Sequence, residues 1–170
     1  MAMTDTLAPT QEQEEQLVVF TLNDESYGVN IEDVNTIIRP PELTFVPHAP
    51  AYIKGVINLR GFIVPVISLR VRFGLPDSGT TKATRVVVVE HEGMLIGMEV
   101  DAVTETLHLA CVNIEPLSPI VLSVDAEYLR GVGKYQDRLL ILLDLPRVLR
   151  PEDTAAINAL TVTANAGVVQ

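Results

Sequence analysis

The stretch GVINLRGFIVPVISLR, residues 55–70, places three residues with binding chemistry inside the most apolar part of the chain. Asn58 and Arg60 are two positions apart, so they share one face of a strand, while Gly61 permits the positive φ of a tight turn. A rigid turn that presents an amide and a guanidinium is suited to binding a carboxylate of another protein through charge-assisted hydrogen bonds. The simpler interpretation is a hairpin turn, NLRG, with Arg60 exposed at its tip, and the two interpretations are compatible.

Residue types that could catalyse a reaction or bind a metal do not cluster in the sequence. The histidines His48, His91 and His108 are scattered, and none has Cys or carboxylate neighbours at metal-binding spacing. The chain has no Gly-x-Ser-x-Gly elbow and no dinucleotide fingerprint, and GVGK at 131–134 has Tyr128 where a P-loop requires glycine. We therefore expect no catalytic residue, no metal site and no cofactor, in a protein that is not an enzyme.

Charge and composition weigh against several classes of partner. The 170 residues carry a net charge of -10, which repels phosphate backbones and anionic lipid head groups. A small-barrel nucleic-acid binder would need a basic face with stacking aromatic residues, and the chain has only four Tyr and four Phe. No signal peptide or membrane-spanning run is visible. We expect a cytoplasmic protein that neither binds nucleic acid nor inserts into membranes.

Most of the chain between residues 17 and 150 predicts short strands separated by Gly, Pro, Asn and Asp, which is typical of small barrels or sandwiches. The predicted strands are QLVVFTL, YGVNI, GVINL, FIVPVISL, RVVVVE, LIGMEV, TLHLACV and LLILLDL. The segments NDESYG and EHEGML are predicted hairpin turns, and LPRVLRPED is a helical candidate. The polar residues 1–16 predict a disordered arm, and residues 151–170 predict a short helix and a flexible tail.

An internal repeat relates the two halves of this region. Residues 17–34 match 86–103 at an offset of 69, and residues 51–69 match 127–145 at an offset of 76, which pairs Gly55 with Gly131. Strand-rich segments align by chance more easily than others, but here turns, Gly, Tyr and a basic residue all recur in order. The repeats, about 17–75 and 84–150, predict two similar β-barrels joined through an apolar seam, with the same strand order in each repeat.

The combination of motifs resembles the family of chemotaxis coupling proteins named CheW. The motifs are Tyr-Gly, Pro-x-x-x-Pro-x-Tyr-Ile-Lys-Gly, Asn-Leu-Arg-Gly and Pro-Val-Ile-x-Leu-Arg, in this order, and the resemblance covers roughly residues 16–150. It implies an all-β fold of two five-stranded SH3-like barrels with a short C-terminal helix. It also implies a scaffold without catalysis that couples the cytoplasmic tip of methyl-accepting chemoreceptors to the regulatory domain of the CheA histidine kinase, in arrays associated with the membrane.

The resemblance also implies a receptor-facing surface, but it assigns no residue that contacts the kinase. Carried over position by position, this surface includes Val34, Thr36 and Ile37, together with Arg60 of the turn. Asn58 and Gly61 shape that turn. Ordinary core packing is an equal alternative for the two aliphatic residues.

Two positions depart from the pattern of the family, and both bear on the choice of partner. Thr36 stands where an acidic residue is common, and Ser68 stands where Asp is usual, although Asp144 keeps the acid in the second repeat. A paralogue that serves another chemosensory pathway, such as pilus motility, is therefore an alternative, and a small-barrel nucleic-acid-binding module is an alternative from another class.

Overall fold

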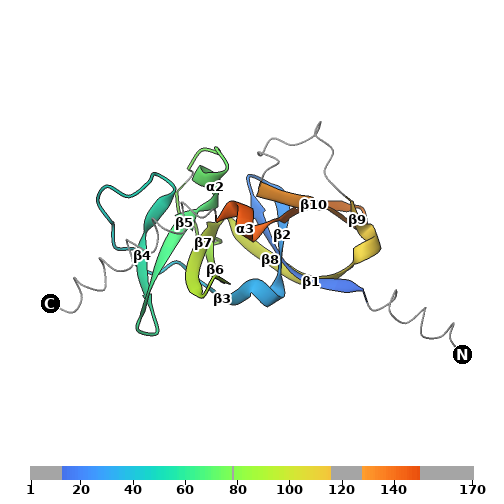
Figure 1. Cartoon of the computed structure of the whole chain (residues 1–170). Coiled ribbons are helices and arrows are strands. Elements are labelled where there is room, and N and C mark those ends of the chain that lie inside the picture. The colour runs from blue at the N-terminus through green and yellow to red at the C-terminus, as the bar shows by residue number, and fades with distance from the viewer. Residues whose placement is uncertain (1–12, 78, 116–127, 150–170) are drawn as a thin grey trace, which may run out of the picture.

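Two small β-barrels lie side by side in the computed structural model, which describes residues 13–77, 79–115 and 128–149 (Figure 1). In chain order the elements are β1 (Glu14–Leu22), β2 (Glu25–Asn30), η1 (Ile31–Asp33), β3 (Val34–Ile38), β4 (Ile53–Leu59), β5 (Phe62–Ser68), α2 (Leu69–Arg72), β6 (Arg85–His91), β7 (Met94–Val100), β8 (Ala102–Ala110), η2 (Cys111–Asn113), β9 (Ile114–Glu115), β10 (Leu129–Tyr135), β11 (Arg138–Leu143) and α3 (Leu145–Val148). No helix among these described residues is long and apolar enough to cross a bilayer.

The strand order confirms the predicted all-β fold with two five-stranded SH3-like barrels. The first barrel has the order β3-β6-β7-β5-β4, and the second has the order β8-β1-β2-β11-β10-β9, in which the sixth strand, β9, has two residues. Each barrel contains one parallel strand pair, β5 with β7 and β11 with β2, while the other pairs are antiparallel.

The repeats of the sequence do not coincide with the barrels, because each repeat gives its first hairpin to the other barrel. The hairpin β1–β2 comes from the first repeat but lies in the second barrel, between β8 and β11. The hairpin β6–β7 comes from the second repeat but lies in the first barrel, between β3 and β5. Both barrels therefore combine strands from the two halves of the chain.

The hydrogen-bond registers confirm the predicted repeat. Val18 pairs with Val29 and Val87 pairs with Met98, which is the same pair moved by 69 positions. Gly55 faces Val66 in β5, and 76 positions later Gly131 faces Leu142 in β11. The two glycines recur for a physical reason, since a Cβ would lie 2.5 Å from the carbonyl oxygen of Thr44 at the first and 2.8 Å from that of Glu115 at the second.

Several boundaries differ from those expected from the sequence. The strand β1 begins at Glu14, so residues 14–16 belong to the second barrel and not to a disordered arm. The cause is tertiary, because the Glu15 carboxylate accepts a hydrogen bond of 3.0 Å from the guanidinium of Arg130. The helix α3 occupies only Leu145–Val148 of the helical candidate. The arm up to residue 12 and the predicted helix and tail at 151–170 lie outside the described residues.

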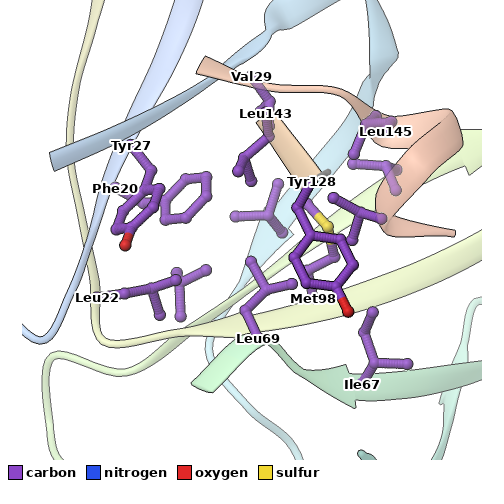
Figure 2. Close-up of a cluster of buried hydrophobic side chains, with 14 of the residues drawn as sticks. Phe20, Leu22, Tyr27, Val29, Ile67, Leu69, Met98, Tyr128, Leu143 and Leu145 are labelled. Carbon is purple, nitrogen blue, oxygen red and sulfur yellow. The ribbon is translucent and has the colours of Figure 1, made fainter. Parts of the chain in front are cut away.

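The largest hydrophobic cluster lies between the barrels, and we call it the seam cluster. It receives side chains from both sides, such as Phe20 of β1 in the second barrel and Met98 of β7 in the first, which Figure 2 shows facing a common centre. A smaller cluster fills each barrel. Because β1 and β6 bury residues on both faces, their sequences are continuous apolar runs and not alternating ones.

An aromatic row and the partly buried Arg72 lie at the seam cluster. Phe73, directly after α2, lies 6.0 Å from Tyr27 and 5.2 Å from Tyr128, measured between ring centroids. The guanidinium carbon of Arg72 lies 4.9 Å from the ring centre of Tyr52 and 5.2 Å from that of Tyr128. These two tyrosines are equivalent in the repeat, so Arg72 lies between matching residues of the two halves and adds a cation–π contact to each.

An ion pair fixes the chain where it passes from the first barrel to the second. Asp101 lies between β7 and β8 and accepts hydrogen bonds from Arg70 Nε at 2.7 Å and Arg70 Nη2 at 2.6 Å. The backbone N–H of Asn23, in the turn between β1 and β2, donates to the same carboxylate at 2.9 Å. The bonds from Arg70 and then from Asn23 lower the pKa of Asp101 below its usual value, against an opposing effect of burial.

We expect Asp101→Asn to destabilise the protein at neutral pH but not in acid. The folded pKa is lower than the unfolded one, so the ionised carboxylate stabilises the fold above an unfolded pKa of about 3.9. That stabilisation is lost as the pH falls through the folded pKa. A loss of about 2 kcal/mol at pH 7 is the expected size for hydrogen bonds to a charged group. Urea unfolding at pH 7 and pH 3 measures the difference, and an equal loss at both values would contradict the role of the charge.

Candidate partner-binding surface

The turn between β4 and β5 presents the polar residues that the sequence singled out. Arg60 and Gly61 are its two central residues, with φ of 53° and 86°, and the backbone N–H of Gly61 donates to Asn58 Oδ1 at 2.9 Å. Two positive φ angles match the right-handed twist of the flanking strands. Arg60 is exposed and has no ion pair within the described parts of the chain. The predicted turn is confirmed, and its guanidinium is available to another molecule.

The strand β3 carries the other three residues of the predicted surface. It is an edge strand that pairs only with β6, and its register shifts between Val34 and Thr36. The shift puts Val34 and Ile37 on the same face, where both pack against the seam cluster while staying partly exposed. Core packing therefore accounts for part of each of these side chains. Thr36 lies on the opposite face and is half-buried.

The repeat indicates that β3 and the tip of the β4–β5 hairpin lie on the same side of the first barrel (Figure 1). Glu105 and Arg138 of the second barrel form an ion pair of 2.9 Å. Glu105 is equivalent to Thr36, because Glu105 pairs with Val19 and Thr36 pairs with Val88, the matching valine of the other repeat. Arg138 is equivalent to Phe62, the first residue of β5. This equivalence indicates that Thr36 and Phe62 lie toward the same side of the first barrel, and in Figure 1 the hairpin tip and β3 lie on the same side of that barrel.

Phe62 is a member of this surface that the sequence reasoning missed. Its side chain is 65% exposed, although it begins a strand whose later residues are buried. Phe62 is two positions from the exposed Arg60, and a large apolar side chain near an arginine is typical of the residues that dominate protein–protein contacts. The sequence feature that could have indicated its exposure is its position directly after Gly61, at the end of a hairpin where the strands leave the core. We call Thr36, Asn58, Arg60, Gly61 and Phe62 the hairpin-tip surface.

The departure at Ser68 affects the fold and not this surface. Ser68 is 2% exposed, and its Oγ accepts a hydrogen bond of 3.2 Å from the backbone N–H of Val71, so it is the N-cap of α2. Asp144 caps α3 in the same way by accepting from the backbone N–H of Arg147. Ser caps a helix as well as Asp does, so this departure has a structural role in the fold. The expectation that it influences the choice of partner stays a prediction.

Groups of metal-ligating side chains are absent from the parts of the chain that the structure describes. His48 lies in the loop after β3, His91 ends β6 and His108 lies in β8. These positions belong to different segments, and no catalytic constellation forms around them in the described ranges. The surface described above offers hydrogen bonds, charge and apolar area, which is chemistry for binding.

Comparison with known proteins agrees with this picture. The family model described as the CheW-like domain matches residues 16–153. The chemotaxis protein CheW of Klebsiella aerogenes is 35% identical, with 85% of this chain and 87% of that protein covered, and CheW of Helicobacter pylori is 36% identical, with 81% and 82% covered. The crystal structure of the scaffolding protein TtCheW from Thermoanaerobacter tengcongensis has a TM-score of 0.76 at 37% identity, covering 82% of this chain and 94% of that one. The chain belongs to the CheW family.

Proposed function

We propose that this protein is a non-enzymatic chemotaxis adaptor that couples methyl-accepting chemoreceptors to a CheA-type histidine kinase. Membership of the CheW family supports the adaptor function, since the match extends over most of the described fold. The observation that carries the receptor contact is the exposed Arg60, which has no ion pair with any described residue and lies on a tight turn two positions before the exposed Phe62. Val34 and Ile37 contribute through their exposed parts.

The receptor and the kinase bind different surfaces of the adaptor. A receptor tip supplies carboxylates and an apolar helix face for the hairpin-tip surface, and the regulatory domain of the kinase binds elsewhere on the barrels. Each contact is modest, at or below about 1,600 Å² of buried surface, and the many contacts of an array provide the strength. The protein works in the cytoplasm and reaches the membrane through its partners.

Family membership does not favour the nucleic-acid-binding alternative, and the net charge of -10 also weighs against it. A paralogue in a second chemosensory pathway would keep the same fold and the same type of contact. The two cases differ only in the receptor and kinase that are used. A test with partners from the same organism therefore distinguishes them.

The test is co-sedimentation of the purified protein with a receptor cytoplasmic fragment and the CheA-type kinase, with kinase autophosphorylation measured in parallel. We expect all three proteins to sediment together, and we expect the kinase to respond to the receptor only when this protein is present. Binding to neither partner would contradict the proposed pathway. Phosphorylation that is the same with and without the protein would contradict coupling.

A further inference from the structure

A cationic pocket lies in the first barrel where β3 ends and β6 begins. Its volume is about 440 Å³, and its lining includes Arg39, Lys82 and Arg85 with Thr80 and Thr81. No acidic side chain contributes to this lining. Three cations around one cavity are unusual on a protein that has 12 basic and 22 acidic residues. The pocket therefore has a local charge opposite to that of the molecule.

The register of the sheet brings two of these cations to the same end of the ladder. Ile38 pairs with Val86 in the last pair of the antiparallel ladder of β3 and β6. Arg39 directly follows Ile38 and Arg85 directly precedes Val86, so both arginines flank this last pair, and both line the pocket. Like charges held close together repel each other unless a counter-charge lies between them.

That counter-charge does not come from the described residues. None of the three cations forms an ion pair with a carboxylate there, although other basic residues such as Lys54 and Arg70 do. Arg85 Nη1 donates to the backbone oxygen of Lys82 at 2.9 Å and to that of Thr84 at 2.8 Å, which holds its guanidinium in place. Among the residues that the structure describes, the guanidinium of Arg39 and the ammonium of Lys82 donate no hydrogen bond to a protein acceptor.

From this arrangement we propose that the pocket binds the phosphate group of a small molecule, either inorganic phosphate or a phosphate monoester. All the charges that line the pocket are positive, and a phosphate has enough acceptor oxygens to bind Arg39, Lys82 and Arg85 at once. The volume exceeds that of a phosphate ion, which leaves room for the organic part of an ester. The inference is independent of the adaptor function, because the pocket is defined by its own cations.

The test is isothermal titration calorimetry of the full chain with inorganic phosphate, with glycerol 3-phosphate and with acetate, at constant ionic strength. We expect binding of the first two and at least tenfold weaker binding of acetate, which is a monoanion with fewer oxygens. Tighter binding of glycerol 3-phosphate than of phosphate identifies an ester as the preferred ligand, and equal binding identifies the phosphate group alone. Acetate binding as tight as that of phosphate would overturn the proposal.

Variants locate the binding site. Arg39→Gln and Lys82→Gln each remove an exposed charge that has no ion-pair partner in the described ranges, and we expect each to weaken phosphate binding about tenfold. Arg85 is left unchanged because its guanidinium holds the loop. The control is Lys134→Gln, which removes an exposed lysine of the second barrel.

Thermal unfolding gives a second measurement, because phosphate at ten times its Kd raises the folded-to-unfolded ratio about elevenfold. An equal phosphate response in the wild type and in Arg39→Gln would show that the pocket is not the site.

Discussion

Arg60→Glu is expected to weaken binding to a receptor cytoplasmic fragment at least tenfold while the protein stays folded. The substitution reverses the only charge on the hairpin-tip surface, so attraction to a receptor carboxylate becomes repulsion. Each tenfold loss of affinity corresponds to about 1.4 kcal/mol. The fold is unaffected because Arg60 is exposed and forms no ion pair with described residues. Calorimetry or co-sedimentation with the fragment measures the loss, and circular dichroism checks the fold.

The repeat provides a matched control for this experiment. Gln136 is the equivalent residue in the turn between β10 and β11, and its φ is also 53°. Gln136→Glu therefore introduces the same side chain in the same backbone conformation on the other barrel, and we expect no change in receptor binding. A similar loss in both variants would indicate an effect of total charge, and unfolding of Arg60→Glu alone would assign this residue a structural role.

Phe73→Ala is expected to remove about 3 to 5 kcal/mol of the free energy of unfolding. The ring is 7% exposed and lies between Tyr27 and Tyr128, so its removal leaves a cavity where side chains of the two barrels meet. A domain of this kind has a total stability of about 5 to 15 kcal/mol, so the loss is a large part of it. Urea unfolding followed by circular dichroism measures the change.

Phe62→Ala is the matched control, because it truncates the same side chain at a position that is 65% exposed. We expect it to change the free energy of unfolding by less than about 0.5 kcal/mol. We expect it instead to weaken receptor binding, since Phe62 is exposed at the same hairpin tip as Arg60. A loss below about 1 kcal/mol for Phe73→Ala would mean that the seam cluster does not hold the barrels together.

Local sequence signals predicted much of the fold. Apolar runs located eight of the strands, and the turns at Asn23 and Asp24, at Arg60 and Gly61, and at Glu92 and Gly93 lie where turn-forming residues predicted them. The repeat of Gly55 and Gly131 was visible because both positions exclude a side chain. The turn at the hairpin tip was predicted correctly as exposed, because its polar residues separate two short apolar strands that pair with each other.

The features that local signals did not predict depend on contacts distant in sequence. The strand β3 was not predicted because VNTII follows a short 3-10 helix and becomes a strand only by pairing with β6. The helix α2 was missed, although α3 is its equivalent in the repeat. Two further features depend on segments far apart in the chain. Arg39 and Arg85 meet at the end of the β3–β6 ladder, and Arg72 lies between two tyrosines.

The exchange of hairpins between the repeats has a consequence for biosynthesis. When the first half of the chain has left the ribosome, both barrels are incomplete. The first barrel lacks the β6–β7 hairpin, which lies between β3 and β5 in the sheet, and the hairpin β1–β2 lacks its neighbours β8 and β11. The parallel pairs β5–β7 and β2–β11 also close late, because they join distant segments and their loop closure costs entropy. Neither half can complete a barrel alone. A ribosome stalled at the midpoint would hold an unfinished product with exposed strand edges, and the two halves gain their structure as a single cooperative unit.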